Sequence, residues 1–156
     1  MRSVSGIVLL GLLISCAVAL PGGAKPIQHA TSYLPATDIE RFIVEKMDLS
    51  TFRNSLGPRR EPGMRVFAHF GLHPQTQSNG LIELKEEGWY YSVRVLGRSD
   101  FNRDGLEDVA VCFTDQALVG TYRTETPLLL TRFSDDGLLI AIAYEIDADT
   151  CGKSRQ

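Results

Sequence analysis

The chain has 156 residues and carries 16 basic and 19 acidic side chains, which give a formal net charge of −3. This balance argues against a protein that binds nucleic acid through charge alone, because such domains are usually basic. Hydrophobic residues make up 44% and charged residues 22%, ordinary values for a globular chain that exclude a mostly disordered one. The length accommodates a single domain.

Residues 1–24 are predicted to form a signal peptide. Arg2 is the only charged residue before Lys25, and the stretch between them is rich in aliphatic residues. A positive start, an apolar stretch and small residues behind it are typical of an export signal. We expect cleavage after Ala19 or Ala24, which leaves an exported protein that is periplasmic or secreted.

A second interpretation of this region makes the protein a lipoprotein. Residues 13–16 resemble a bacterial lipobox, in which Cys16 would carry the lipid and bring the chain to a membrane. Ile14 fits that pattern poorly, so we favour simple cleavage. A retained membrane anchor is a third alternative, which Gly11 and Ser15 disfavour.

The cysteines support export. Cys16 leaves with the signal peptide or carries the lipid, so Cys112 and Cys151 remain as one pair. An even number of cysteines in an oxidising compartment indicates a disulfide bond, which the chain-entropy estimate values at up to about 4 kcal/mol. The alternative is two unpaired thiols, with Cys112 as a small buried strand residue.

After a linker over residues 25–36, residues 38–47 are predicted to form a helix. Thr37 and Glu40 have the spacing of a capping box. Apolar residues follow at helical spacing: Ile39, Phe42, Ile43 and Met47. Residues 51–56 could form a short strand.

The rest of the chain is predicted to form strands, because apolar and polar residues alternate. The predicted strands are residues 65–70, 81–84, 89–96, 108–114, 127–133 and 138–146. The turn Ser134-Asp135-Asp136-Gly137 is typical of a hairpin. Layer packing then predicts an α+β fold for residues 37–156, with one antiparallel meander sheet of about five strands and the N-terminal helix packed on it.

Three adjacent aromatic residues could form a sugar-stacking platform: Trp89, Tyr90 and Tyr91. Successive side chains of a strand point to opposite faces, so Trp89 and Tyr91 share one face and Tyr90 lies on the other. The pattern therefore favours a core position for Trp89 and Tyr91 and leaves only Tyr90 exposed.

The stretch from Asp100 to Asp108 has the pattern of a calcium-binding loop. Oxygen-bearing side chains stand at positions 1, 3, 5 and 9 of this stretch, and Gly105 at position 6 permits a sharp turn. The expected ligands are the side chains of Asp100, Asn102, Asp104 and Asp108 and the backbone carbonyl of Leu106. The alternative is a metal-free turn rich in Asp, Asn and Gly.

The same residues resemble the loop of the integrin-type FG-GAP and VCBS repeats, whose pattern is Asp-x-Asn-x-Asp-Gly-x-x-Asp followed by a buried strand. The resemblance covers about a dozen residues in one copy, so the propeller that those repeats build does not carry over. The EF-hand fits less well, because Val111 stands where that loop has a bidentate Glu. We therefore expect Ca²⁺ to bind with a dissociation constant of about 10⁻⁴–10⁻³ M and to play a structural role.

A group of arginines forms a weaker candidate site. Four of them lie within a short segment: Arg53, Arg59, Arg60 and Arg65. Such a group could bind phosphate or carboxylate groups of an envelope polymer. The alternative is a solvated surface balanced by Glu61.

Two histidines, His69 and His73, are four residues apart and would share one face of a helix, as zinc ligands do. Gly71 lies between them and Pro74 follows, so a helix is disfavoured and a solvated loop is expected.

These patterns favour an exported binding or interaction module of the cell envelope with a structural calcium loop. Its partner would be an envelope protein or polymer. One alternative is a small secreted or periplasmic hydrolase, and another is an inhibitor of a secreted enzyme that acts through residues 53–65. We assign no catalytic residue, because no nucleophile elbow, P-loop or dinucleotide motif is present.

Overall fold

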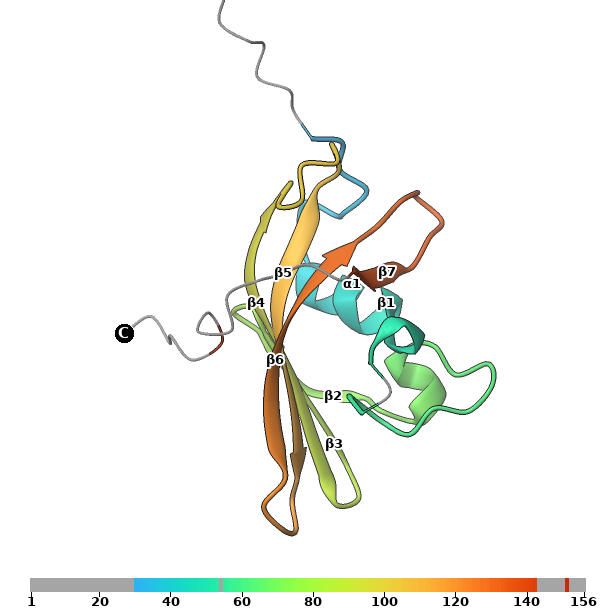
Figure 1. Cartoon of the computed structure of the whole chain (residues 1–156), viewed down its shortest axis with the longest axis vertical. Coiled ribbons are helices and arrows are strands. Elements are labelled where there is room, and N and C mark those ends of the chain that lie inside the picture. The colour runs from blue at the N-terminus through green and yellow to red at the C-terminus, as the bar shows by residue number, and fades with distance from the viewer. Residues whose placement is uncertain (1–29, 54, 143–150, 152–156) are drawn as a thin grey trace, which may run out of the picture.

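The computed structural model describes residues 30–53, 55–142 and 151 (Figure 1). These residues form a seven-stranded sheet, curled into a half-barrel, and one short α-helix. The strands are β1 (Met47–Asp48), β2 (Pro74–Ser78), β3 (Leu81–Glu86), β4 (Trp89–Ser99), β5 (Asp108–Ala117), β6 (Arg123–Thr131) and β7 (Leu139–Ile142). The helices are α1 (Ile39–Lys46) and two 3₁₀ helices, Leu49–Thr51 and Phe67–Phe70.

The prediction of a five-stranded antiparallel meander with a packed helix is wrong. The strand order is β1-β7-β6-β5-β4-β3-β2, and β1 pairs with β7 in parallel, whereas the other neighbouring strands are antiparallel. The sheet is therefore mixed. β1 has two residues and β2 reads Pro-Gln-Thr-Gln-Ser, so neither strand has the apolar alternation on which a strand prediction depends.

Helix α1 lies close to its predicted bounds, but its N-terminus is not held by a capping box. Asp38 precedes the helix in the left-handed conformation, with φ of 55°, and makes no side-chain capping hydrogen bond. Glu40 instead accepts a hydrogen bond through Oε1 from the Gly80 N–H at 2.7 Å. Glu40 thus joins the helix to the β2–β3 turn.

The predicted strand over residues 65–70 is also wrong. Phe67–Phe70 form a 3₁₀ helix that ends at Gly71, where φ is 70°. The buried side chain is Phe67, whereas alternation would have buried the opposite face, which carries Val66, Ala68 and Phe70. The described residues of the segment 51–56, which are all but residue 54, likewise form no strand.

The hydrophobic core lies between the inner face of the sheet and the helical segments (Figure 1). Val111 and Phe113 of β5 point into it, together with Tyr91 of β4. Ile43 of α1 and Phe52 cover them, and the Phe52 and Phe113 rings pack edge to face at 5.1 Å. No helix in the described part of the chain has the length and apolarity needed to cross a membrane.

The predicted disulfide bond is confirmed. Cys112 lies on the outer face of β5, between Val111 and Phe113, and is bonded to Cys151 with a Cα–Cα distance of 5.5 Å. Arg94 of β4 donates a hydrogen bond to the Cys151 carbonyl. The predicted signal peptide, Cys16, the start of the linker and residues 143–146 lie outside the described residues.

The longest strand pair gives the sheet two distinct ends. β4 and β5 pair from Trp89 opposite Ala117 to Ser99 opposite Asp108. At about 3.3 Å per residue, these ends are roughly 30 Å apart. The predicted calcium loop joins the strands at one end, and the β5–β6 turn lies at the other (Figure 1).

Candidate functional site

The predicted calcium loop connects β4 to β5, and Asp108, the first residue of β5, binds the start of the loop through its carboxylate. Arg103 and Gly105 have φ of 64° and 87°, so the loop turns sharply at both residues. Asp108 is fully buried and accepts hydrogen bonds from the Phe101 N–H at 3.1 Å and from the Thr131 hydroxyl. Burial raises the pKa of Asp108, although these hydrogen bonds partly oppose the shift.

The predicted side-chain ligands Asp100, Asn102 and Asp104 accept hydrogen bonds within the loop. Asp100 accepts through its two oxygens from the N–H groups of Asp104 and Gly105, each at 3.0 Å. Asn102 Oδ1 accepts from the Asp104 N–H at 3.0 Å, and Asp104 Oδ1 accepts from the Leu106 N–H at 2.9 Å. Each such oxygen has a second lone pair, so the donor set suits a hard cation. Among residues 30–53, 55–142 and 151, no three acidic, His or Cys side chains converge as a metal-ion group, and calcium binding stays a prediction.

The N-terminal segment is attached to this loop, which the sequence analysis did not anticipate. The Thr31 N–H donates to the Gly105 carbonyl at 2.7 Å, and the Glu107 N–H donates to the Thr31 carbonyl at 2.8 Å. The Arg98 guanidinium forms an ion pair with Glu107 at 2.9 Å and also donates to the Pro35 carbonyl at 2.7 Å. The loop therefore fixes the point at which the chain enters the sheet domain.

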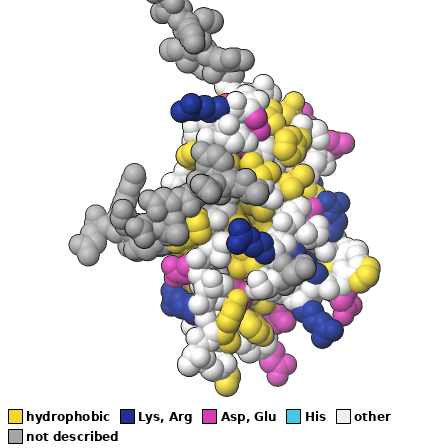
Figure 2. All heavy atoms as spheres, in the orientation of Figure 1, with side chains coloured by type: hydrophobic (Ala, Val, Ile, Leu, Met, Phe, Trp, Pro, Cys, Tyr) yellow, Lys and Arg dark blue, Asp and Glu magenta, His cyan; other side chains and the backbone are white. Residues whose placement is uncertain are grey.

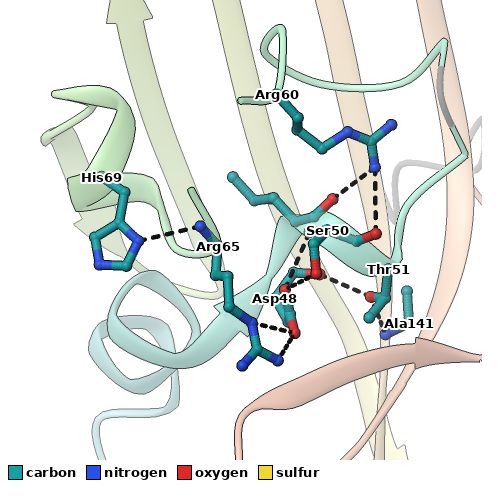
Figure 3. Close-up of polar contacts among 8 residues, drawn as sticks. Asp48, Ser50, Thr51, Arg60, Arg65, His69 and Ala141 are labelled. Atoms are coloured by element: carbon teal, nitrogen blue, oxygen red, sulfur yellow. Dashed lines mark hydrogen bonds and ion pairs between the residues drawn. The ribbon is translucent and has the colours of Figure 1, made fainter. Parts of the chain in front are cut away.

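Two of the four arginines of the candidate anion site, Arg60 and Arg65, bind acceptors within the protein (Figure 3). Arg60 donates to the backbone carbonyls of Leu49 and Phe52 at 2.9 and 2.7 Å. Arg65 forms an ion pair with the buried carboxylate of Asp48. These two guanidinium groups therefore hold the protein's own acceptors, whereas Arg53 and Arg59 are exposed.

Asp48 is the centre of the network in Figure 3. Its burial would raise the pKa of the carboxyl, but hydrogen bonds from Arg65 and Ser50 outweigh that effect and hold the pKa below its ordinary value. His69 accepts a hydrogen bond through Nδ1 from the Arg65 N–H at 3.1 Å. His69 and His73 are both exposed, as the solvated-loop interpretation expects.

At the opposite end of the sheet, apolar side chains are exposed on the β5–β6 turn. Val119 is 86% exposed, and Leu118 and Tyr122 are exposed to 53% and 43%. Figure 2 shows hydrophobic side chains at the surface at the lower end of the molecule, where Figure 1 places this turn. The Leu118 N–H donates to the Gly88 carbonyl at 2.8 Å and so joins this turn to the β3–β4 turn. We call Leu118, Val119 and Tyr122 the turn patch.

A cleft of about 580 Å³ opens beside the turn patch. Segment 55–60 forms one side, and the adjoining ends of β4 and β5 form the other. Its lining residues are Ser55, Gly57, Arg59, Arg60, Trp89, Asp115 and Tyr122. Trp89 is only half-buried, so the core position predicted for it holds in part, whereas Tyr91 is fully buried.

Asp115 is the residue of this cleft that the sequence analysis missed. It lies two residues beyond Phe113 in β5, on the same inward face as Val109 and Val111. Asp is rarely buried without a partner. An Asp that continues the buried apolar face of a strand therefore indicates a candidate functional residue, and this signal is present in the sequence. The arrangement of Tyr122 beside it could not be read from any local pattern.

No family model matches the sequence, and comparisons with curated proteins and with solved structures find no match.

Proposed function

We propose that the mature chain is an exported binding module of the cell envelope, attached at one end of its sheet and binding at the other. The Cys112–Cys151 bond supports export, because disulfides persist in oxidising compartments. The intact mass of the exported protein tests processing, since we expect loss of the residues up to Ala19 or Ala24. A diacylglycerol on Cys16 would instead establish the lipoprotein alternative.

The calcium loop belongs to the attachment end. Three carboxylates at positions 1, 5 and 9 of the loop repel one another, and a bound Ca²⁺ offsets that repulsion. The same loop holds the N-terminal segment through Thr31 and Glu107. We propose that calcium stiffens this junction and so fixes the orientation of the sheet relative to the preceding linker.

The turn patch is the observation that carries the binding proposal. Large apolar side chains at the tip of a turn contribute little to folding, because they stay in water. Grouped exposed apolar residues are typical of interaction sites. The patch lies at the end of the sheet remote from the N-terminal segment, where an attached module has free access to a partner.

Co-sedimentation with an envelope fraction tests this proposal. The disulfide-bonded mature protein should sediment with the fraction, and the double variant Leu118→Ser/Val119→Ser should stay in the supernatant. Phe133→Ser is the matched control, because Phe133 is also 53% exposed but follows β6 at the attachment end. Equal sedimentation of the double variant and the wild type would place the binding surface elsewhere.

A further inference from the structure

The cleft beside the turn patch has two aromatic walls that are held in place. The Trp89 and Tyr122 rings meet edge to face, with centroids 5.7 Å apart and planes inclined at 70°. Behind them Trp89 stacks on the buried Tyr91 at 6.4 Å, and the Tyr122 hydroxyl donates to the Ser55 carbonyl at 3.3 Å. These contacts present a preformed apolar surface to whatever enters the cleft.

A buried carboxylate with a spare acceptor lies beside these rings. Asp115 is 2% exposed, and its Oδ2 accepts a hydrogen bond from the Gly57 N–H at 2.8 Å. Oδ1 is buried and has no hydrogen-bond partner in the described part of the chain. Nearly all buried polar atoms are paired, so this oxygen calls for a donor that the described residues do not supply.

The charges around the cleft restrict the kind of ligand. An organic cation alone would face the guanidinium groups of Arg59 and Arg60, and an anion alone would face the carboxylate of Asp115. A neutral ligand avoids both repulsions. To satisfy the lining it needs a hydroxyl donor for Asp115, an acceptor for a guanidinium group, and an apolar face for the rings.

We infer that this cleft binds one ring of a neutral saccharide. The C–H face of the sugar packs on Trp89 and Tyr122, one hydroxyl donates to Asp115 Oδ1, and another accepts a hydrogen bond from the exposed Arg59. The volume of the cleft lies within the range of about 300–1,000 Å³ found for small-ligand sites. This inference rests on the proposed function, since it names the ligand class at the binding end.

Intrinsic fluorescence tests the inference directly, because Trp89 is the single tryptophan of the sequence. The mature, disulfide-bonded protein is titrated with chitotriose, cellotriose and maltotriose. At least one of these sugars should change the Trp89 emission in a saturable way. Tyr122→Ala removes one wall of the cleft and should weaken that binding at least tenfold, whereas Phe133→Ala, an exposed aromatic residue at the far end, should leave it unchanged.

Asp115→Asn provides a second variant, because it turns one acceptor oxygen into a donor at nearly constant shape. Sugar binding should weaken about tenfold while the emission spectrum of the free protein stays the same. The inference is overturned if none of the three sugars changes the emission, or if Tyr122→Ala binds them as well as the wild type does. A response to phenyltrimethylammonium or inorganic phosphate alone would also overturn it in favour of an ionic ligand.

The two proposals fail separately. If envelope binding depends on Leu118 and Val119 but no sugar changes the Trp89 emission, the saccharide proposal is wrong and the proposed binding end is retained. Loss of both the sedimentation and the fluorescence response removes both proposals.

Discussion

Replacing Asp104 by Asn distinguishes a metal site from a hydrogen-bonded turn. Asp104 accepts hydrogen bonds from the Leu106 N–H at 2.9 Å and from the Asn102 side-chain amide at 2.8 Å. Asn at this position keeps an acceptor for the Leu106 N–H. It loses the bond from Asn102 and one negative charge. The variant should therefore weaken calcium binding far more than it weakens the hydrogen bonds of the loop.

The expected change in the free energy of unfolding on replacing Asp104 differs between calcium-free and calcium-containing solution. Without calcium, the lost hydrogen bond contributes about 0.5–1.5 kcal/mol, and the relief of repulsion offsets part of it. With calcium at roughly a hundred times its dissociation constant, binding adds about 2.7 kcal/mol to the free energy of unfolding. If the variant binds a hundredfold more weakly, the same calcium concentration adds only about 0.4 kcal/mol.

Denaturant unfolding of the disulfide-bonded protein, in excess calcium chloride and in EDTA, measures both values. We expect calcium to stabilise the wild type and to have little effect on Asp104→Asn. Asp136→Asn is the control, because Asp136 also accepts a local hydrogen bond, from Ser134 at 2.6 Å, in another turn. The difference between the unfolding midpoints of Asp136→Asn and the wild type should be the same in calcium chloride and in EDTA. A wild-type midpoint that is the same in calcium and in EDTA would refute the calcium site.

Three further predictions concern the frame of the fold, each measured by urea unfolding. The double variant Cys112→Ala/Cys151→Ala should lose up to about 4 kcal/mol relative to the oxidised protein, because the bond closes a sequence separation of 39 residues, and reductant should then have no further effect. Arg60→Met should cost about 1–3 kcal/mol, because backbone carbonyls lose their donor. Asp48 has a lowered pKa in the folded state, so its stabilisation should be present above about pH 4 and be lost as the pH falls through the folded pKa. Arg65→Met should reduce that pH dependence.

Local patterns predicted the central strands and the disulfide, and longer-range contacts determined the rest. β3, β4 and β5 were found because each carries several alternating apolar residues, and Cys112 and Cys151 were the only pair left after Cys16. The parallel pairing of β1 with β7 brings Met47 beside Leu139, which no periodicity over a few residues encodes. The seven-stranded mixed sheet could therefore not be derived from the sequence pattern.

The cleft shows the same limit. Trp89 was singled out, but alternation alone predicted a core position and could not show that the side chain stays partly exposed. Segment 55–60 closes the cleft through the hydrogen bond between Gly57 and Asp115, across 58 residues of sequence. The predicted strand ended one residue before Asp115, so neither its inward position nor the absence of a partner for its Oδ1 among the described residues was predicted.

Asp115 gives a final test, because its buried carboxyl should reduce stability at neutral pH. Burial raises the pKa of Asp115, and the hydrogen bond from Gly57 opposes this only in part. For a raised folded pKa, the contribution to stability is complete below the unfolded value of about 4 and is lost as the pH rises through the folded pKa. Asp115→Asn does not titrate at this position. Relative to the wild type, its free energy of unfolding should therefore rise between about pH 3 and about pH 7.

Asp136→Asn should change in the opposite direction, because a hydrogen bond from Ser134 lowers the pKa of Asp136. Urea midpoints of both variants and the wild type at the two pH values measure the effect. A variant Asp115→Asn that loses stability toward neutral pH would show that this carboxylate is well paired in the folded state. The expected gain would instead mean that Asp115 costs stability at neutral pH, and residues that do so are typical of sites kept for binding rather than for folding.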